Sequence, residues 1–278
     1  MNTESGAYPF GFHNNKKAIP KFFFTKLRLK NFLASPKKTI RETLKKNNLI
    51  RNTVIKLRTI AKKKKKSNTM LDKNKISKLL STKSPVIFEI GAGDGGDTLD
   101  FLKIFDSVDA KLFVFEPEPK NIAILKNRIK DQRFNLFEGA VSDIDGKVWF
   151  HRSRTSNSQD LSLSGSIMKP KNVLKIWNWI YFDQNIQISS ITIDVFCKMN
   201  NIQKIDFIWC DAQGAEERII MGGQESFKNK VRYFYTEYSN EEQYENQPTL
   251  KKILQLLPSF EIIEDFGTDV LLKNKNIK

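Results

Sequence analysis

Short apolar runs alternate with stretches of helical spacing from about Pro85 to the end of the chain. Strands are predicted at the apolar runs, which are Val86–Ile90, Lys111–Phe115, Phe134–Phe137, Ile205–Cys210 and Val231–Glu237. Helices are predicted between them, at Thr98–Phe105, Pro119–Lys130, Ala215–Met221 and Pro248–Leu257. Strands separated by helices favour an α/β fold, in which a mainly parallel sheet carries helices on both faces.

Two segments break this alternation. Phe260–Glu264 and Val270–Leu272 flank a turn and predict a closing hairpin, whose antiparallel strands we expect at the edge of the sheet. His151–Asn185 is polar and too long for an ordinary connection, so we expect an insertion there that is either a lid or disordered. The insertion contains an aromatic cluster that either stacks on a sugar ring or anchors the segment, formed by Trp177, Trp179, Tyr181 and Phe182.

Charge divides the chain in two. Residues 1–80 contain 22 Lys and Arg and three acidic residues, whereas residues 81–278 contain 25 basic and 28 acidic residues. We therefore predict a Lys-rich N-terminal extension over 1–80, helical or disordered, ahead of a folded domain over 81–278. A solvated tail is the favoured interpretation, and peripheral membrane contact through residues 16–66 is the second. Nucleic-acid binding ranks third, because only 10 of the 47 basic residues are Arg.

Other features of the sequence limit the class of protein. The sequence contains no run of about 18 apolar residues, so we expect no transmembrane helix. The first 20 residues have no apolar stretch ahead of a cleavage site, so we expect no secretory signal. Cys197 and Cys210 have no metal-ligand spacing and are expected to be small core residues in a reducing compartment. We expect a cytoplasmic protein, with peripheral membrane attachment as an open alternative.

A glycine-rich turn at residues 89–97 directly follows the first predicted strand. Such a turn lets the backbone approach a ligand and opens a helix N-terminus. Gly91, Gly93 and Gly95 are spaced G-x-G-x-G, and Glu89 precedes the first of them by two residues. Gly96 also completes a G-x-G-x-x-G pattern, so this turn by itself leaves a dinucleotide oxidoreductase open.

Two later turns follow the second and third predicted strands. Glu116 lies about 20 residues beyond the glycine turn, where a carboxylate suits the hydroxyls of a ribose. The alternative role of Glu116 is that of an acid at a helix N-terminus. Val141 and Ser142 belong to the turn after the third strand and are candidates for contact with an adenine edge.

These segments together resemble the FkbM-type family of class I methyltransferases. The resemblance rests on Phe88–Gly95, Phe115–Pro117, Ala140–Asp143, Ile193-Asp194, Asp206–Glu216 and Thr236-Glu237. It covers roughly residues 86–272, and its most specific part is Asp211-x-x-Gly214-x-Glu216. It implies a Rossmann-like sheet of seven strands, mostly parallel with an antiparallel last strand and flanked by helices. It also implies S-adenosylmethionine as methyl donor and a small-molecule or glycan hydroxyl as acceptor, in a sugar, a glycolipid, a polysaccharide or a secondary metabolite.

The resemblance and the turns give one set of candidate site residues. The cofactor is expected to contact Glu89, Gly91, Gly93, Gly95, Glu116, Val141, Ser142 and Asp211. A hydroxyl is a poor nucleophile and needs a base or an electrophile, so Asp211 and Glu216 are predicted as base and orienting residue, or as joint ligands of a divalent cation. Their structural alternative is that Glu216 caps its helix and Asp211 holds the turn. His151 is a third candidate base, with a surface role as its alternative.

Other functions remain open at this point. A nucleic-acid methyltransferase that acts on the ribose 2′-hydroxyl and is recruited by the basic extension is the nearest competitor. Methylation of base amines is disfavoured, because the chain lacks an Asn/Asp-Pro-Pro-aromatic motif after the fourth strand of the parallel series and has Asp211–Gly214 there. A dinucleotide oxidoreductase ranks third, and the later motifs of the resemblance count against it. A degenerate fold without activity is the last alternative.

Overall fold

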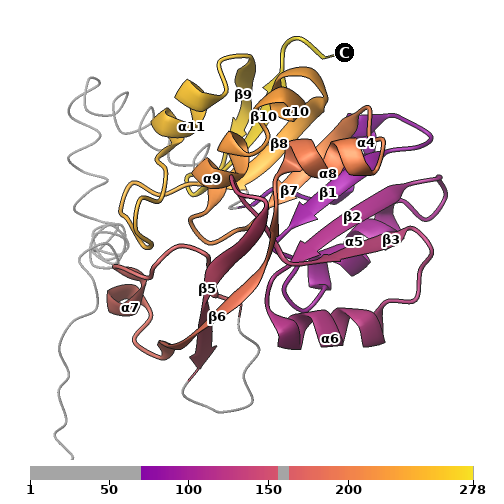
Figure 1. Ribbon diagram of the computed structural model, residues 1–278. Helices are drawn as coiled ribbons and strands as arrows, with labels where there is room; N and C mark the ends of the chain where they lie inside the picture. Colours follow the sequence, from indigo (N-terminus) through magenta and orange to yellow (C-terminus); the bar gives the residue numbers. More distant parts are fainter. Residues whose placement is uncertain (1–69, 156–162, 278) are drawn as a thin grey trace, which may run out of the picture. The chain divides into compact units, whose positions relative to one another are not determined.

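The computed structural model describes residues 70–155 and 163–277, and Figure 1 shows them as a sheet with helices on both of its faces. The predicted membrane-contact segment, residues 16–66, lies outside this part of the chain. Within it, no helix is long and apolar enough to cross a membrane. Cys197 and Cys210 are both free and buried, as expected of small core residues.

The main sheet has seven strands in the order β3-β2-β1-β7-β8-β10-β9. The first five of these pair in parallel and are β3 (Phe134–Glu138), β2 (Lys111–Glu116), β1 (Val86–Ile90), β7 (Ile205–Cys210) and β8 (Val231–Glu237). The predicted hairpin is confirmed as β9 (Phe260–Asp265) and β10 (Asp269–Asn274). Its second strand lies one position inside the edge, because β10 pairs antiparallel with both β8 and β9.

Each strand of the central parallel region buries side chains on both faces, which explains the nearly unbroken apolar runs. On β1, Phe88 belongs to one core and its neighbour Ile87 to the other. The four predicted helices are α5 (Gly96–Ile104), α6 (Pro119–Arg128), α9 (Glu216–Met221) and α11 (Leu250–Leu256). Two helices that the sequence pattern does not predict are α8 (Ile193–Met199) and α10 (Gln224–Asn229).

A further helix, α4 (Asn74–Leu80), lies ahead of β1. Leu71, Ile76 and Leu80 belong to the same hydrophobic core as the buried residues of α5. The folded domain therefore includes residues 71–80, ten residues before the boundary predicted from charge. Charge misplaces this boundary because α4 carries lysines on its exposed side and apolar residues on its buried side.

The insertion lies between the two long strands of a second sheet. Strands β5 (Gly146–Thr155) and β6 (Ile180–Ile191) form a long antiparallel pair, and β4 (Ala140–Val141) pairs with β6. The expectation of disorder is therefore wrong for residues 151–155 and 180–185, which are strand residues. The first half of β6 is largely exposed on both faces, so its sequence lacks the alternation that marks a strand.

The segment between β5 and β6 is attached to the rest of the domain by backbone pairing. It contains the short helix α7 (Val173–Ile176), and Pro170 forms a bridge with Tyr244 after β8. Of the aromatic cluster, Trp177, Trp179 and Tyr181 are exposed, and the half-buried Phe182 packs edge-on against Tyr244. Anchoring thus falls to Phe182 and not to the tryptophans.

Candidate active site

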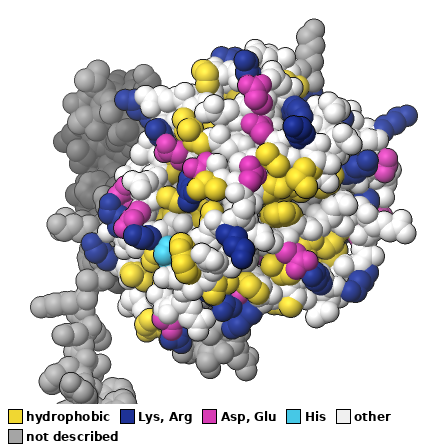
Figure 2. All heavy atoms as spheres, in the orientation of Figure 1, with side chains coloured by type: hydrophobic (Ala, Val, Ile, Leu, Met, Phe, Trp, Pro, Cys, Tyr) yellow, Lys and Arg dark blue, Asp and Glu magenta, His cyan; other side chains and the backbone are white. Residues whose placement is uncertain are grey.

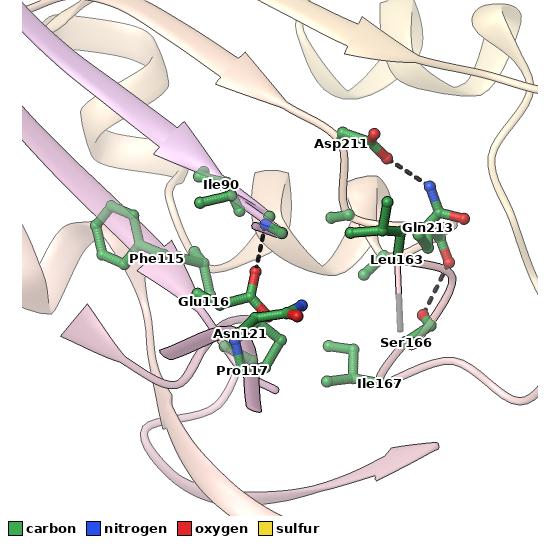
Figure 3. A pocket seen from close by; sticks show the side chains of 18 of the residues that line it. Ile90, Phe115, Glu116, Pro117, Asn121, Leu163, Ser166, Ile167, Asp211 and Gln213 are labelled. Carbon is green, nitrogen blue, oxygen red and sulfur yellow. Dashed lines mark hydrogen bonds between the residues drawn. The ribbon is translucent and has the colours of Figure 1, made fainter. Parts of the chain in front are cut away.

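A cavity of about 230 Å³ opens at the carboxyl ends of β1, β2 and β7. This is the place where open parallel sheets bind their ligands. Figure 3 shows its walls, which come from the strand ends and from the segment that follows β5. Five of the predicted site residues line it, namely Gly91, Gly93, Glu116, Val141 and Asp211.

Gly91 marks the closest approach between two strand ends. Its φ is +86°, and a Cβ there would lie 1.9 Å from the backbone oxygen of Asp211. Gly91 also donates its N–H to the Phe115 carbonyl at 3.0 Å, which ties the turn to β2. The glycine at this position brings β1, β2 and β7 together at the floor of the cavity.

Gly95 has a different role from the one predicted. It does not line the cavity; it precedes α5 with φ +83°, and a Cβ there would lie 2.6 Å from a methyl carbon of Leu125 on α6. Gly95 therefore permits close packing of the turn against α6, and the glycines of this turn that line the cavity are Gly91, Gly93 and Gly96.

Glu116 closes the cavity at the end of β2. Its Oε2 accepts a hydrogen bond from the Gly93 N–H at 2.7 Å, and its Oε1 accepts from the Glu118 N–H at 2.9 Å and from Asn121 Nδ2 at 3.3 Å. Burial raises the pKa of Glu116 to about 7, against the effect of these hydrogen bonds. The carboxyl is thus held in one orientation beside the glycine turn.

Two further residues predicted to touch the cofactor lie behind the cavity wall. Glu89 is fully buried and absent from the lining, and burial raises the pKa of its carboxyl to about 8. Ser142 is fully buried as well, and its hydroxyl donates to Asp143 Oδ1 at 2.9 Å. Neither side chain lines the cavity.

Asp211 extends from the end of β7 into the cavity. Its Oδ1 accepts a hydrogen bond from Gln213 Nε2 at 2.5 Å, which Figure 3 shows as a dashed line. Burial raises the pKa of Asp211 to about 6, and the negative charges of Asp97 and Asp269 act in the same direction. Asp211 is therefore mostly ionised at neutral pH and still a better proton acceptor than an exposed aspartate.

Glu216 does not reach the cavity. It is fully buried at the first turn of α9, where its Oε1 accepts from the Gly214 N–H at 3.3 Å. Burial raises the pKa of Glu216 to about 7. Glu216 is thus buried beneath the turn that carries Asp211, and the N-cap residue of α9 is Ala215.

His151 also lies away from the cavity. Its neighbour Phe150 lines the cavity, and successive residues of a strand point to opposite faces, so the imidazole faces outward. Its Nδ1 is 2.7 Å from Asn185 Oδ1 on β6. Among the described residues, no group of three or more His, Cys, Asp and Glu side chains is arranged to hold a metal ion.

Several lining residues escape prediction from the sequence. Phe150, Leu163, Ser166 and Ile167 come from β5 and the segment after it, where the sequence shows no recognisable motif. Gln213 belongs to the Asp211–Glu216 motif, and its position two residues after Asp211 could have identified it as a residue that lines the cavity. Figure 2 shows hydrophobic side chains reaching the surface between charged ones on the face that it displays.

The sheet order and the glycine turn, with a carboxylate at the end of β2, define a Rossmann-like protein of the class I methyltransferase type. Residues 89–267 match the family model for the methyltransferase FkbM domain. The chain therefore belongs to the FkbM methyltransferase family, and the protein is a methyltransferase.

This chain is similar to one curated protein in sequence and to several solved structures in fold. The 2-O-methyltransferase NoeI of Sinorhizobium fredii is 40% identical over 220 residues, which cover 77% of this chain and 89% of NoeI. Among solved structures, the FkbM methyltransferase of Methylobacillus flagellatus matches 69% of this chain and 44% of its own at 14% identity, with a TM-score of 0.42. This chain thus spans less than half the length of that protein. A putative O-methyltransferase from Klebsiella pneumoniae gives a TM-score of 0.41 at 11% identity, over 74% and 81% of the two chains.

Proposed function

We propose that this methyltransferase transfers a methyl group from S-adenosylmethionine to a hydroxyl of a sugar, either free or within a glycolipid or polysaccharide. The observation that carries the proposal is the Asp211 carboxylate, which lines the cavity at the end of β7. The name of NoeI, a 2-O-methyltransferase, supports oxygen as the methylated atom.

The residues around the cavity fit this cofactor. The glycine turn leaves room for a ligand beside the N-terminus of α5, and Val141 offers an apolar contact for a base. Glu116 holds its carboxyl at the end of β2, and its lone pairs can still accept from ribose hydroxyls. When bound, S-adenosylmethionine supplies an electrophilic methyl group on a sulfonium sulfur.

Asp211 is proposed to take the proton of the acceptor hydroxyl. The acceptor oxygen would take the methyl group as the methyl carbon–sulfur bond breaks and S-adenosylhomocysteine leaves, and the hydroxyl proton would pass to Asp211 Oδ. The transfer of the methyl group is an in-line displacement, so alignment and exclusion of water contribute much of the rate. Phe150, Leu163 and Ile167 are the apolar lining residues that exclude water on the side of the second sheet.

Methylation of a ribose 2′-hydroxyl in a nucleic acid would use the same chemistry. The basic residues that favour this alternative lie outside the described part of the chain. Among the described residues, the cavity is lined by acidic side chains, Asp94, Asp97, Glu116 and Asp211, and by no Lys or Arg. Asp97 and Asp94 are paired with Lys73 and Arg128, but no cation among the described lining residues faces the cavity to bind a phosphate, so the sugar is the proposal that the site supports best.

The proposal is tested with the purified full chain and radiolabelled S-adenosylmethionine. We expect label transfer to neutral mono- and oligosaccharides and none to RNA oligonucleotides, with the Asp211→Asn variant as the inactive control. The transferred methyl group should resist mild base, as an ether does and an ester does not. Transfer of label to RNA alone would overturn the choice of acceptor. If calorimetry shows that NAD binds and S-adenosylhomocysteine does not, the choice of cofactor is overturned.

A further inference from the structure

Gln213 adopts an uncommon backbone conformation at the edge of the cavity. Its φ is +52°, in the left-handed region that residues other than Gly, Asn and Asp rarely adopt. Such a conformation costs free energy and persists where surrounding contacts over-determine it. At Gln213 these contacts include the backbone oxygen, which accepts a hydrogen bond from Ser166 Oγ at 2.8 Å.

The side-chain amide of Gln213 is held at both of its polar atoms. Its Nε2 donates to Asp211 Oδ1 at 2.5 Å, and its Oε1 lies 3.0 Å from the Tyr244 hydroxyl, whose single proton is shared between this oxygen and the Ser164 carbonyl oxygen. An amide whose oxygen is engaged by a donor must turn its nitrogen the other way, and here that direction is the Asp211 carboxylate. Figure 3 shows Gln213 between Asp211 and Ser166.

Tyr244 is well placed to fix this orientation. The side chain is 1% exposed and packs against Gly214, where a Cβ would lie 2.9 Å from the Tyr244 Cβ. Its hydroxyl also lies 2.8 Å from the carbonyl oxygen of Ser164, in the segment between β5 and β6. Gln213 is therefore the point where the end of β7, the segment after β5 and the loop after β8 meet.

We propose that Gln213 is the positioning residue for Asp211: its amide nitrogen holds the carboxylate toward the cavity and stabilises its ionised form. Tyr244 keeps the amide in the orientation that this requires. The inference deepens the proposed function, because it rests on Asp211 as the residue that accepts the proton.

The charges around Asp211 make this hydrogen bond consequential. The charged groups that act on Asp211 or feel its charge are Asp97 on α5, Glu216 on α9, Glu237 on β8 and Asp269 on β10. All four are acidic and, when ionised, oppose ionisation of Asp211. Within the described part of the chain, the hydrogen bond that counteracts them comes from Gln213.

The experiment measures the titration of Asp211 directly and needs no acceptor. The full chain is labelled with aspartate carrying 13C at the carboxyl carbon, and the Asp211 resonance is assigned by its loss in Asp211→Asn. In Gln213→Asn the backbone keeps a residue that tolerates a positive φ, but the amide is one methylene too short to reach the carboxylate. In this variant we expect the proton affinity of Asp211 to rise roughly tenfold, which moves the titration midpoint upward by about one pH unit.

Two further variants complete the test. Tyr244→Phe releases the amide from one side, so we expect a smaller upward movement of the midpoint. Ser166→Ala is the matched control, because it removes a contact to the Gln213 backbone and leaves the amide in place, and its midpoint should stay that of the wild type. Cofactor affinity in all three variants should remain within about threefold, as expected of a residue that acts through Asp211.

An unchanged Asp211 midpoint in Gln213→Asn would overturn the positioning role. If that variant fails to fold, Gln213→Glu keeps the side-chain length and replaces the donor by an acid, and an unchanged midpoint there would overturn the role equally. Failure of the wild-type enzyme to methylate any sugar is a separate result. It would count against the proposed acceptor while the titration still decides the role of Gln213.

Discussion

The two halves of the cavity are built in different ways. The half formed by β1 and β2 relies on backbone atoms and one carboxyl, with Gly91, Gly93 and Glu116 all within 26 residues of each other. The half formed by β7 and the second sheet relies on side chains far apart in sequence, such as Ser166 and Gln213, which are 47 residues apart. The first half is a local motif, whereas the second exists only after the chain has folded.

This contrast suggests a division of labour. In the proposed function, the local half holds the cofactor and the long-range half faces the acceptor. The two halves are joined at Gly91, whose backbone approaches the Asp211 carbonyl, and by the ion pair between Arg152 on β5 and the buried Glu118 after β2. Variants in each half should therefore change different measured quantities.

The largest expected effect is on turnover, in the half formed by β7. Asp211→Asn keeps the size of the side chain and removes the proton acceptor, so we expect kcat to fall about a thousandfold. Labelled methyl transfer at saturating acceptor measures this effect. A kcat within about threefold of the wild type would show that another group accepts the proton.

The second-largest expected effect is on stability and on binding of S-adenosylhomocysteine, in the half formed by β1 and β2. In Gly91→Ala the new Cβ would collide with the Asp211 backbone oxygen at 1.9 Å, so the strand ends must move apart. We expect about 3 kcal/mol of lost stability and roughly hundredfold weaker binding of S-adenosylhomocysteine. Denaturant unfolding and calorimetry measure the two losses.

Gly267→Ala is the matched control for that variant. Gly267 has φ +97°, and a Cβ added there would meet no atom within 4 Å, so the variant experiences the backbone strain without the collision. Binding of S-adenosylhomocysteine should be unchanged in this control. Equal loss of binding in both variants would assign the effect to global destabilisation and not to the cavity.

A pH effect of intermediate size is expected at Glu116. Burial raises its pKa to about 7, so the carboxyl becomes protonated as pH falls from about 8 to about 6, which turns one oxygen into a donor and weakens the carboxyl as an acceptor for ribose hydroxyls. We expect the affinity for S-adenosylhomocysteine to fall about fivefold to tenfold over this range. In Glu116→Gln the affinity should be low and independent of pH; a pH dependence that persists in this variant would point to another titrating group.

The smallest effect concerns the attachment of the segment after β5. Ser166→Ala removes the hydrogen bond to the Gln213 carbonyl and the one that Ser166 Oγ accepts from the Met168 N–H at 2.9 Å. We expect about 1 kcal/mol of lost stability in denaturant unfolding. Substitution of the exposed Ser189 by Ala is the control, and equal stability of the two variants would contradict the attachment.

The same contrast explains what the sequence could predict. β1, β7 and β8 begin and end where the apolar runs do, because both faces of these strands are buried. Gly91, Gly93 and Glu116 could be placed at the cavity because a short turn and the end of the next strand must meet in this fold. Asp211 could be placed at the cavity because the family resemblance identifies it at the end of a parallel strand.

The remaining features depend on contacts that no local pattern encodes. His151 and Phe150 are neighbours, and only the register of β5 against β6 decides which one faces the cavity. Glu216 was predicted beside Asp211, but the turn at Gly214 directs it into the core. Leu163 and Ser166 reach the cavity through pairing of their segment with β5 and with the loop after β8.

The division between the two halves is tested most directly by calorimetric titration of Asp211→Asn with S-adenosylhomocysteine, beside the wild-type chain. We predict saturable binding by both, with dissociation constants within about threefold of each other, because Asp211 acts on the acceptor. A collapse of affinity in the variant would place Asp211 in the cofactor half and contradict its role as the proton acceptor.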